Sequence, residues 1–348
     1  MAIKEYGFGL NWGGQTKEYF VKSLESFCLK KRLSFLWISQ DNEKEVLKQL
    51  QKRELKIKFL LDTQATYNDE KDIYARICYT VKDSGSIVIN DPDRTKSYID
   101  KSVMHYELLK AGITVPYSLI IRSWEPSNFK LPDEEKNNLG TPFIVKPACG
   151  YAQQGVLTDA NGSASEIARA RKFDPNDNFL LQEKISPVDL DGKRAWFRIF
   201  YLFGKIIPCW WDDRHCLYQH ATVEDFRKHS LWNLAKTTLE IARINQMQWF
   251  STEIAIDRKG KTKRFVVIDY VNDQCDMTSQ CESEKGIPNA IVDYTAYSIV
   301  STAHRLINKR AANKDSFVWF KDKSVVSLMD LEEADLSSHP QTTATKSR

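Results

Sequence analysis

The sequence lacks several features that would assign it to a common functional class. No apolar run reaches the length of a membrane-spanning helix, and residues 1–10 lack the apolar core that signal peptides carry. Basic residues form no block, and 50 Lys and Arg residues are nearly balanced by 46 Asp and Glu residues, giving a net charge of +4. We therefore expect a cytoplasmic protein whose partners include neither membranes nor nucleic acids.

The sequence also lacks the regular cysteine spacing that is typical of disulfide-bonded proteins. The seven cysteines are odd in number and irregularly spaced, and none forms a C-x-x-C motif, so we expect reduced thiols. Their densest cluster also contains histidines and consists of Cys209, His215, Cys216 and His220. Its spacing fits no common zinc motif, so buried thiols and polar loop residues are the favoured interpretation, with a zinc site as the alternative.

A Walker motif is absent, but a different lysine and glycine arrangement occurs at residues 141–156, TPFIVKPACGYAQQGV. The Walker lysine follows its glycines, whereas Lys146 precedes them. β-Branched and aromatic residues predict a strand that ends near Lys146, followed by a loop bounded by Gly150 and Gly155. A lysine on a rigid strand suits phosphate binding, as does a loop whose glycines let backbone N–H groups approach closely.

Residues 1–90 alternate predicted strands and helices. Apolar runs near residues 6, 33, 57 and 87 are typical of buried strands, and the segments between them carry apolar residues at helical spacing. This alternation predicts a small parallel sheet covered on both faces, with a ligand crevice at the carboxyl ends of its strands. We expect four residues that follow two of these strands to face the crevice: Asn11, Gly13, Gly14 and Asp62.

A helical stretch follows this alternating segment. Asp91 and Pro92 are typical of a helix start and Gly112 of a helix end, with a break expected near Asp100 and Lys101. Most charged residues on helices face solvent, which is one interpretation of Lys101. The other interpretation is that Lys101 supplies a second cation to a phosphate group.

Residues 193–204 predict a strand that carries an arginine among large apolar residues. Trp196, Arg198 and Phe200 alternate with Phe197 and Ile199, so Arg198 shares a face with bulky side chains. A buried guanidinium requires an anionic partner. That partner is either an acidic neighbour or a bound phosphate or substrate carboxylate, and the sequence leaves both open.

Residues 249–271 predict a β-hairpin with acidic residues inside both strands. Glu253 lies in the first strand and Asp269 in the second, followed by Asn272 and Asp273. Carboxylates inside a hairpin must be compensated, and a divalent cation such as Mg²⁺ does so by binding several oxygen ligands. Salt bridges or an edge position are the alternative explanation.

The C-terminal part contains one further clear element. Residues 289–310 predict a helix with a broad apolar face. Two apolar patches, 317–320 and 325–329, have no assigned role, and the polar tail from Ala334 is predicted to be disordered.

The order of these parts resembles the ATP-grasp superfamily over residues 1–310. The features that carry the resemblance are the Asp100-Lys101 pair leading to GITVP, Lys146 with its glycine loop, the QEKI segment, the arginine strand and the acidic hairpin ending in asparagine. The resemblance implies an α/β fold with a small alternating N-terminal domain at 1–90 and two α+β lobes, at 91–185 and 186–314, that clamp ATP. Residues 315–348 would be a partly disordered C-terminal extension.

The resemblance also implies ATP and Mg²⁺ as ligands. Residues that would contact or cover the phosphates are Lys101, Lys146 and the loop 149–155 with Gly150 and Gly155. The adenine hinge would include Gln182, Glu183 and Ile185, with Asp189 or Asp191 near the ribose. The metal ligands would be Glu253, Asp269 and Asn272.

The reaction usual for this family is ADP-forming carboxylate–amine ligation. A carboxylate attacks the γ-phosphate, and an amine then attacks the acyl phosphate and releases phosphate. The resemblance implies that Arg198 and Lys146 are catalytic, with Arg198 facing phosphate or substrate, and that Arg214 and His215 hold a substrate carboxylate. The acceptor amine would be free or carried on a peptide, and homodimers are common among such proteins.

Two departures from the family pattern leave alternatives open. The family's metal motif is acid-x-asparagine, but Tyr270 occupies the acidic position, so Asp269 and Asn272 can share one metal only if a bulge intervenes. Otherwise Asp273 supports Asn272. The phosphate loop is also poor in glycine. The alternatives to a ligase are an ATP-grasp kinase, which would require more basic residues around the arginine strand, and a non-catalytic nucleotide-binding regulatory or peptide-recognition protein.

Overall fold

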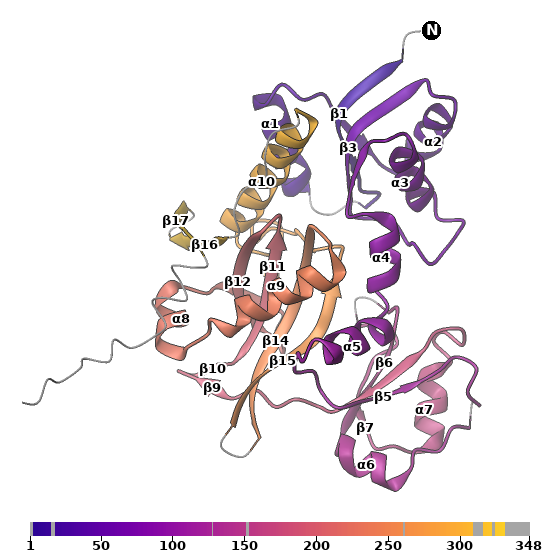
Figure 1. Ribbon diagram of the computed structural model, residues 1–348, viewed down its shortest axis with the longest axis vertical. Coiled ribbons are helices and arrows are strands. Elements are labelled where there is room, and N and C mark those ends of the chain that lie inside the picture. The colour runs from indigo at the N-terminus through magenta and orange to yellow at the C-terminus, as the bar shows by residue number, and fades with distance from the viewer. Residues whose placement is uncertain are drawn as a thin grey trace, which may run out of the picture.

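The computed structural model describes residues 3–14, 18–126, 128–150, 153–259 and 262–308, together with the backbone of 316–321 and 324–330. Within this part of the chain, a parallel sheet, an antiparallel sheet and a larger mixed sheet form three successive units (Figure 1). No helix of these ranges is long and apolar enough to cross a membrane.

The N-terminal unit is a parallel sheet with strand order β2-β1-β3-β4. Its strands are β1 (Lys4–Asn11), β2 (Phe35–Ile38), β3 (Leu55–Asp62) and β4 (Ile87–Ile89), and its helices are α1 (Glu18–Lys30), α2 (Glu43–Gln51) and α3 (Ile73–Asp83). Helices α2 and α3 pack on one face, and α1 packs on the other together with the late helix α10 (Asn289–Ile307). The predicted parallel sheet covered on both faces is therefore confirmed.

Two short helices connect this unit to the next. They are α4 (Pro92–Tyr98) and α5 (Lys101–Lys110), separated by the break that the sequence predicts. The Asp100 carboxylate accepts hydrogen bonds from the backbone N–H groups of Ser102 and Val103, so it caps α5 and makes Lys101 the first helical residue. Lys101 is thus held in place by the helix start itself.

The central unit is an antiparallel sheet with strand order β5-β8-β6-β7 and its own apolar core. Its elements are β5 (Ser118–Ile121), α6 (Asp133–Leu139), β6 (Phe143–Pro147), β7 (Leu157–Ala160), α7 (Ala164–Arg171) and β8 (Phe179–Gln182). Helix α6 starts after Pro132 and carries three acidic residues in its first turn, which suit the positive end of the helix dipole.

The C-terminal unit is a mixed sheet with strand order β15-β14-β11-β12-β16-β17, in which β13 also pairs with β12. Its strands are β11 (Trp196–Leu202), β12 (Lys205–Asp212), β13 (Leu217–His220), β14 (Trp249–Lys259), β15 (Thr262–Asn272), β16 (Ser316–Lys321) and β17 (Ser324–Asp330). A small hairpin, β9 (Asp189–Leu190) with β10 (Lys193–Arg194), precedes them. The two apolar patches without an assigned role are the strands β16 and β17, whereas the tail from Ala334 lies outside the described residues.

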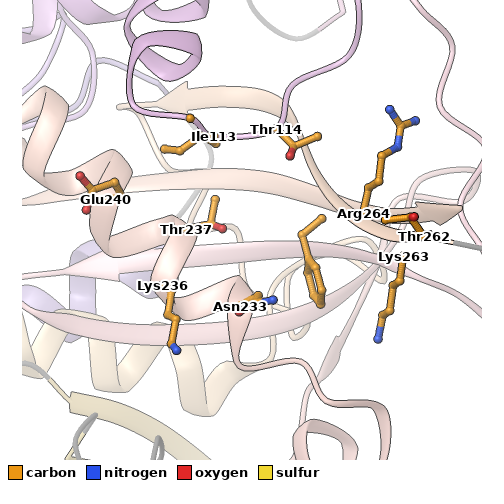
Figure 2. A pocket seen from close by; sticks show the side chains of 11 residues that line it. Ile113, Thr114, Asn233, Lys236, Thr237, Glu240, Thr262, Lys263 and Arg264 are labelled. Carbon is orange, nitrogen blue, oxygen red and sulfur yellow. The ribbon is translucent and has the colours of Figure 1, made fainter. Parts of the chain in front are cut away.

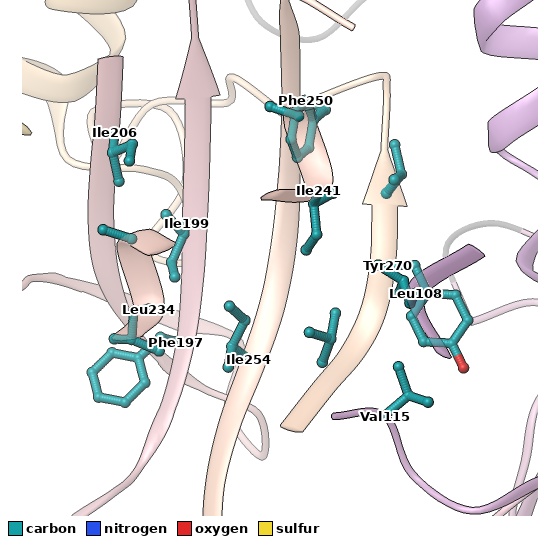
Figure 3. Close-up of a cluster of buried hydrophobic side chains, with 14 of the residues drawn as sticks. Leu108, Val115, Phe197, Ile199, Ile206, Leu234, Ile241, Phe250, Ile254 and Tyr270 are labelled. Carbon is teal, nitrogen blue, oxygen red and sulfur yellow. The ribbon is translucent and has the colours of Figure 1, made fainter. Parts of the chain in front are cut away.

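Different helices cover different parts of this mixed sheet. One face packs against α9 (Asn233–Asn245) through Phe197, Ile199 and Ile254 (Figure 3), next to α8 (Val223–His229). The opposite face packs against α10 and the N-terminal sheet around Phe200 and Trp249. The architecture confirms the predicted fold class, an alternating α/β unit followed by two α+β units.

Candidate active site

Two lysines, one at the start of α5 and one on β6, lie close together near the end of β6. The Lys146 ammonium donates a hydrogen bond to the Ile268 carbonyl at 3.1 Å, and the Lys101 ammonium donates one to the Gly150 carbonyl at 2.9 Å. Lys101 Nζ also lies 3.9 Å from Asp269 Oδ1. Lys146 is 8% exposed, and this burial lowers its pKa to about 8; nearby Asp269 opposes the shift and Lys101 adds to it. Two partly buried cations beside a single carboxylate favour a bound anion.

Backbone and side-chain hydrogen bonds fix the start of the phosphate loop. The Ala148 N–H donates to the Asn178 carbonyl at 2.8 Å, and the Cys149 N–H donates to Asp177 Oδ2 at 2.8 Å. The Lys101 N–H donates to the Ala148 carbonyl at 3.0 Å. These contacts join the start of the loop to the start of α5, so they fix the position of Lys101 relative to residues 148 and 149.

Glycines are required at both ends of this loop. A Cβ atom on Gly150 would lie 2.3 Å from Pro147 Cγ, so any side chain there would displace the proline. Gly155 has a φ of +70°, and a Cβ atom there would lie 2.6 Å from the Phe173 ring. Of the four residues between them, 151 and 152 lie outside the described part of the chain.

Strand register places five polar or reactive side chains in one row across the mixed sheet. Successive cross-strand pairs join Asp269, Glu253, Arg198, Cys209 and His220, on β15, β14, β11, β12 and β13 respectively. Directly paired residues share a face of the sheet. The predicted metal and substrate residues at 198, 253 and 269 therefore lie side by side.

Arg198 has an acidic neighbour, which was one of the two partners that the sequence left open. Its guanidinium forms an ion pair with Glu253, and both side chains are largely buried. Trp196 Nε1 donates to the other carboxylate oxygen of Glu253 at 2.9 Å, and the guanidinium lies 4.9 Å from the centre of the Trp211 ring. Within the described residues, Arg198 Nε has no hydrogen-bond partner, so the guanidinium keeps one buried donor for a ligand.

A β-bulge brings the predicted metal ligands onto one face. Glu253 pairs with Asp269 and Ser251 pairs with Asn272, so two steps along β14 match three steps along β15. Because Ser251 and Glu253 share a face, Asp269 and Asn272 also share it. The structure thus contains the bulge that a shared metal requires.

The donor set fits Mg²⁺ that is also bound by phosphate oxygens. Asp269 Oδ1 is buried and has no hydrogen-bond partner among the described residues, which leaves it available to a cation. The same part of the chain contains no cluster of three or more His, Cys, Asp or Glu side chains able to hold a metal. Mg²⁺ typically binds one or two carboxylates and completes its shell with substrate phosphates and water, so two carboxylates and the Asn272 amide suffice.

The Asp273 carboxylate lies close enough to Asp62, the last residue of β3, for their charges to interact. Burial and the charge of Asp62 raise the pKa of Asp273 to about 7. Asp62 accepts hydrogen bonds from Asn11 Nδ2 at 3.2 Å and from the Tyr67 hydroxyl at 2.7 Å, at the carboxyl ends of β1 and β3. The sequence prediction that this edge meets the ligand crevice stays a prediction, since Asn11 and Asp62 are bound to each other.

Gly13 and Gly14 do not open this edge to a ligand in the described structure. A Cβ atom on Gly13 would lie 2.3 Å from the Tyr74 hydroxyl, and one on Gly14 would lie 2.5 Å from the Trp12 ring. Both glycines therefore allow side chains of their own unit to pack closely against the turn.

The hinge residues have different environments. Gln182 is buried, and its amide donates to the Ser118 hydroxyl at 3.2 Å, so its side chain does not reach a nucleotide base. Glu183 is half-buried and lies 3.8 Å from the Arg264 guanidinium. Ile185 packs in a small apolar cluster with Ala255 and Val266, on the Arg198 face of the sheet.

The two candidate ribose ligands have protein partners instead. Asp191 is exposed and pairs with Lys228 at 2.5 Å and His229 at 3.0 Å, which holds the small β9–β10 hairpin against α8. The hydrogen bond from Lys228 lowers the pKa of Asp191. Asp189 accepts the Gly192 N–H at 2.7 Å within its own turn. The structure does not bring either side chain together with the two lysines.

Arg214 and His215 lie at the tip of the turn between β12 and β13. Both are exposed, and His215 Nδ1 lies 2.7 Å from Asp212 Oδ2. The remaining members of the Cys/His cluster are distributed over β12, this turn and β13, with Cys209 buried opposite His220. Arg214 and His215 therefore stand apart from Arg198, at the rim of the sheet.

Sequence reasoning missed the residues that support Lys146. Its ammonium lies 5.5 Å from the centre of the Tyr270 ring, and the Tyr270 hydroxyl lies 2.7 Å from His105 Nδ1. The signal that was available was Tyr270 itself, an aromatic residue where the family pattern has an acid. His105 carried no signal because its partner is distant in sequence.

A separate cavity of about 650 Å³ lies between α9, the segment 112–114 and the first residues of β15 (Figure 2). Its walls include Thr237 and Glu240 of α9 and Lys263 of β15. None of the predicted site residues lines it, so it is distinct from the site around the two lysines.

Comparisons with known proteins identify the architecture. No protein-family model and no curated protein sequence matches the chain. The D-alanine–D-alanine ligase of Bacillus anthracis, solved with ATP, matches with a TM-score of 0.59 and 16% identity, covering 88% of this chain and 99% of that one. D-Cycloserine synthetase DcsG matches with a TM-score of 0.59 and 12% identity, covering 85% and 99%.

A further solved structure gives the same result. The ATP-grasp ligase PsnB, solved with the precursor peptide PsnA2 and AMPPNP, matches with a TM-score of 0.57 and 12% identity, covering 87% of this chain and 99% of that one. Each match extends over nearly the whole of the solved chain and includes all three sheet units here. The chain therefore has the ATP-grasp fold.

Proposed function

We propose that the chain is an ATP-dependent carboxylate–amine ligase that forms an amide bond and releases ADP and phosphate. The observation that carries the proposal is the convergence of Lys101, Lys146 and Asp269 at the phosphate loop. Oδ1 of Asp269 has no hydrogen-bond partner among the described residues. The names of the similar structures, D-alanine–D-alanine ligase and ATP-grasp ligase PsnB, support the same reaction class.

ATP would bind between the central and C-terminal units. Lys101 and Lys146 would contact its phosphates, and the backbone of the loop 149–155 would cover them. The backbone at Glu183 would read the adenine beside the apolar cluster of Ile185. No ribose ligand is proposed, because Asp189 and Asp191 have partners of their own.

Asp269 and Asn272, with Glu253 beside them, would hold Mg²⁺. When bound, the metal neutralises negative charge on the phosphates. One of the similar structures, PsnB, was solved with Mg and ADP. Glu253 would keep its ion pair with Arg198. This ion pair would fix the orientation of the Glu253 carboxylate between Arg198 and Asp269.

Arg198 would bind the substrate carboxylate and the phosphoryl oxygens. A carboxylate oxygen would attack the γ-phosphorus while the bond to the bridging oxygen breaks, so ADP leaves with that electron pair. The amine would then attack the acyl carbon, and phosphate would leave. The buried Arg198 would balance the negative charge in both steps, and Trp196 and Trp211 would exclude water around it.

A second candidate function is nucleotide binding without turnover, and one observation favours it. Both carboxylate oxygens of Glu253 already accept hydrogen bonds, from Arg198 and Trp196, and Tyr270 replaces the usual acidic ligand. A weakened metal site would bind ATP but transfer its phosphate slowly. The two functions predict different products from the same incubation.

The test is to incubate the chain with ATP and Mg²⁺ together with pooled amino acids, small acids and peptides, and to measure ADP, phosphate and new masses. A condensed product with stoichiometric ADP, lost in Lys146→Ala and Asp269→Asn but retained in the exposed control Asp159→Asn, is the expected result. A phosphorylated product would instead identify a kinase. ATP binding without ADP in any pool would favour the non-catalytic function.

A further inference from the structure

The hydroxyl group of Tyr270 is a buried junction between three elements. Tyr270 lies on β15 and is fully buried; its hydroxyl accepts a hydrogen bond from Gln182 Nε2 of β8 at 3.0 Å. The same hydroxyl lies 2.7 Å from Nδ1 of His105, which is on α5 and is also buried. One oxygen atom thus connects the metal hairpin, the adenine hinge and the helix that begins at Lys101.

The hydrogen bonds of this junction join neutral side chains. Burial, with a contribution from Lys146, lowers the pKa of His105 to about 4, so the imidazole is neutral near pH 7. The Gln182 amide donates to both Tyr270 and Ser118. The tautomer of His105 decides which partner donates in its contact with the Tyr270 hydroxyl, and the contact is a hydrogen bond in either case.

The ring of the same tyrosine supports Lys146. The ammonium lies 5.5 Å from the ring centre and donates to the carbonyl of Ile268, two residues before Tyr270 on β15. The ring attracts the Lys146 ammonium through a cation–π interaction. The Ile268 carbonyl of β15 accepts a hydrogen bond from the same ammonium. Lys146 belongs to β6, so this contact also joins the central unit to the mixed sheet.

Packing alone does not require a hydroxyl at this position. Tyr270 lies at the edge of the buried cluster that also contains Leu108 and Val115 (Figure 3). A phenylalanine would fill the same space and would not need buried polar partners. We therefore attribute the hydroxyl of Tyr270 to its hydrogen bonds with His105 of α5 and Gln182 of β8.

We propose that Tyr270 is a positioning residue that sets Lys101 and Lys146 against the metal hairpin by tying β15 to α5, β8 and β6. This inference rests on the proposed function, because it assigns both lysines to the β- and γ-phosphates of ATP. Tyr270 acts through the lysines and does not touch the nucleotide.

The test compares the affinities of ATP and AMP by calorimetry in the presence of Mg²⁺. AMP lacks the two phosphates that the lysines would contact, so the ratio of the two dissociation constants isolates their contribution. We expect Tyr270→Leu, which loses ring and hydroxyl, to weaken ATP binding about tenfold and AMP binding less than about twofold. Tyr270→Phe keeps the ring and should weaken ATP binding about threefold, also without affecting AMP.

Tyr19→Phe is the matched control. Its hydroxyl donates to Asp293 at 2.8 Å across the contact between α1 and α10, so the variant also loses a partly buried tyrosine hydrogen bond. We expect it to leave both affinities unchanged. Thermal unfolding of each variant establishes that it is folded at the temperature of the titration.

A folded Tyr270→Phe with the wild-type ratio would overturn the proposal, even if Tyr270→Leu fails to fold. Equal weakening of ATP and AMP would also overturn it, since that result indicates a general loss of structure. If the unchanged chain binds ATP and the variants bind it equally, only this inference fails. If the unchanged chain binds no ATP, the proposed function fails with it.

Discussion

Lys146 is a buried cation whose charge opposes folding. Its pKa of about 8 lies below the ordinary value of 10.5 because burial disfavours the charged form. The difference corresponds to roughly 3 kcal/mol of free energy. We predict that Lys146→Met stabilises the protein by up to that amount at pH 7, measured by urea unfolding without ATP, while weakening ATP binding at least about tenfold.

The pH dependence of the same residue has a defined sign. Between about pH 8 and 10.5 the unfolded chain keeps the Lys146 proton and the folded chain releases it, so the wild-type protein gains stability as pH rises. The stability difference between Lys146→Met and wild type should therefore shrink through this window. A constant difference from pH 7 to 10 would contradict the assigned burial.

The Arg198–Glu253 pair is interdependent. Both side chains are largely buried, so removing one leaves the charge of the other without its main partner. Arg198→Met should destabilise the fold by about 3–5 kcal/mol, whereas the double variant Arg198→Met/Glu253→Gln should recover at least half of that loss. Urea unfolding of the single and double variants measures the coupling, and simple additivity would refute it.

At the scale of elements, the phosphate loop depends on the conformation of Gly155. Its φ of +70° and the adjacent Phe173 ring both oppose a side chain. Gly155→Ala should lower ATP affinity about tenfold by displacing the loop. Gly85→Ala is the control, because Gly85 has a φ of +77° with open space around it and lies outside the loop. A similar loss of affinity in both variants would contradict a specific role for the loop.

Local signals explain which elements the sequence predicted correctly. Asp100 caps α5 through its immediate neighbours, so the break before Lys101 was visible in the sequence. The alternation of strands and helices in residues 1–90 is likewise a local pattern. Interactions between residues close in sequence determine these features, so a single sequence is enough to predict them.

Long-range pairing explains what the sequence did not predict. The bulge that aligns Asp269 with Asn272 is set by the register of β15 against β14, and the two strands only define it once they are paired. The ion pair between Asp191 and Lys228 was also not visible in the sequence, because the two residues lie on different elements. The role of His105 depends on Tyr270, which lies in a different unit.

At the scale of the whole molecule, one hydrophobic core joins the N-terminal sheet to the late helix α10. Phe8 and Phe59 of the N-terminal sheet share a buried cluster with Ile291 and Val300 of α10. The central unit has a separate core around Phe143 and Phe179. We therefore propose that residues 91–185 and 186–314 form the two lobes around ATP, with 1–90 packed on the second lobe. The strands β16 and β17 extend the sheet of that lobe.

The most direct test of this account is calorimetric titration of the chain with ATP, with and without Mg²⁺. The account predicts one ATP per chain, tighter binding with Mg²⁺ than without it, and at least about tenfold weaker binding in both Lys101→Ala and Lys146→Met. The Mg²⁺ effect should be lost in Asp269→Asn. Absence of ATP binding by the folded chain, or binding that is unchanged in both lysine variants, would contradict it.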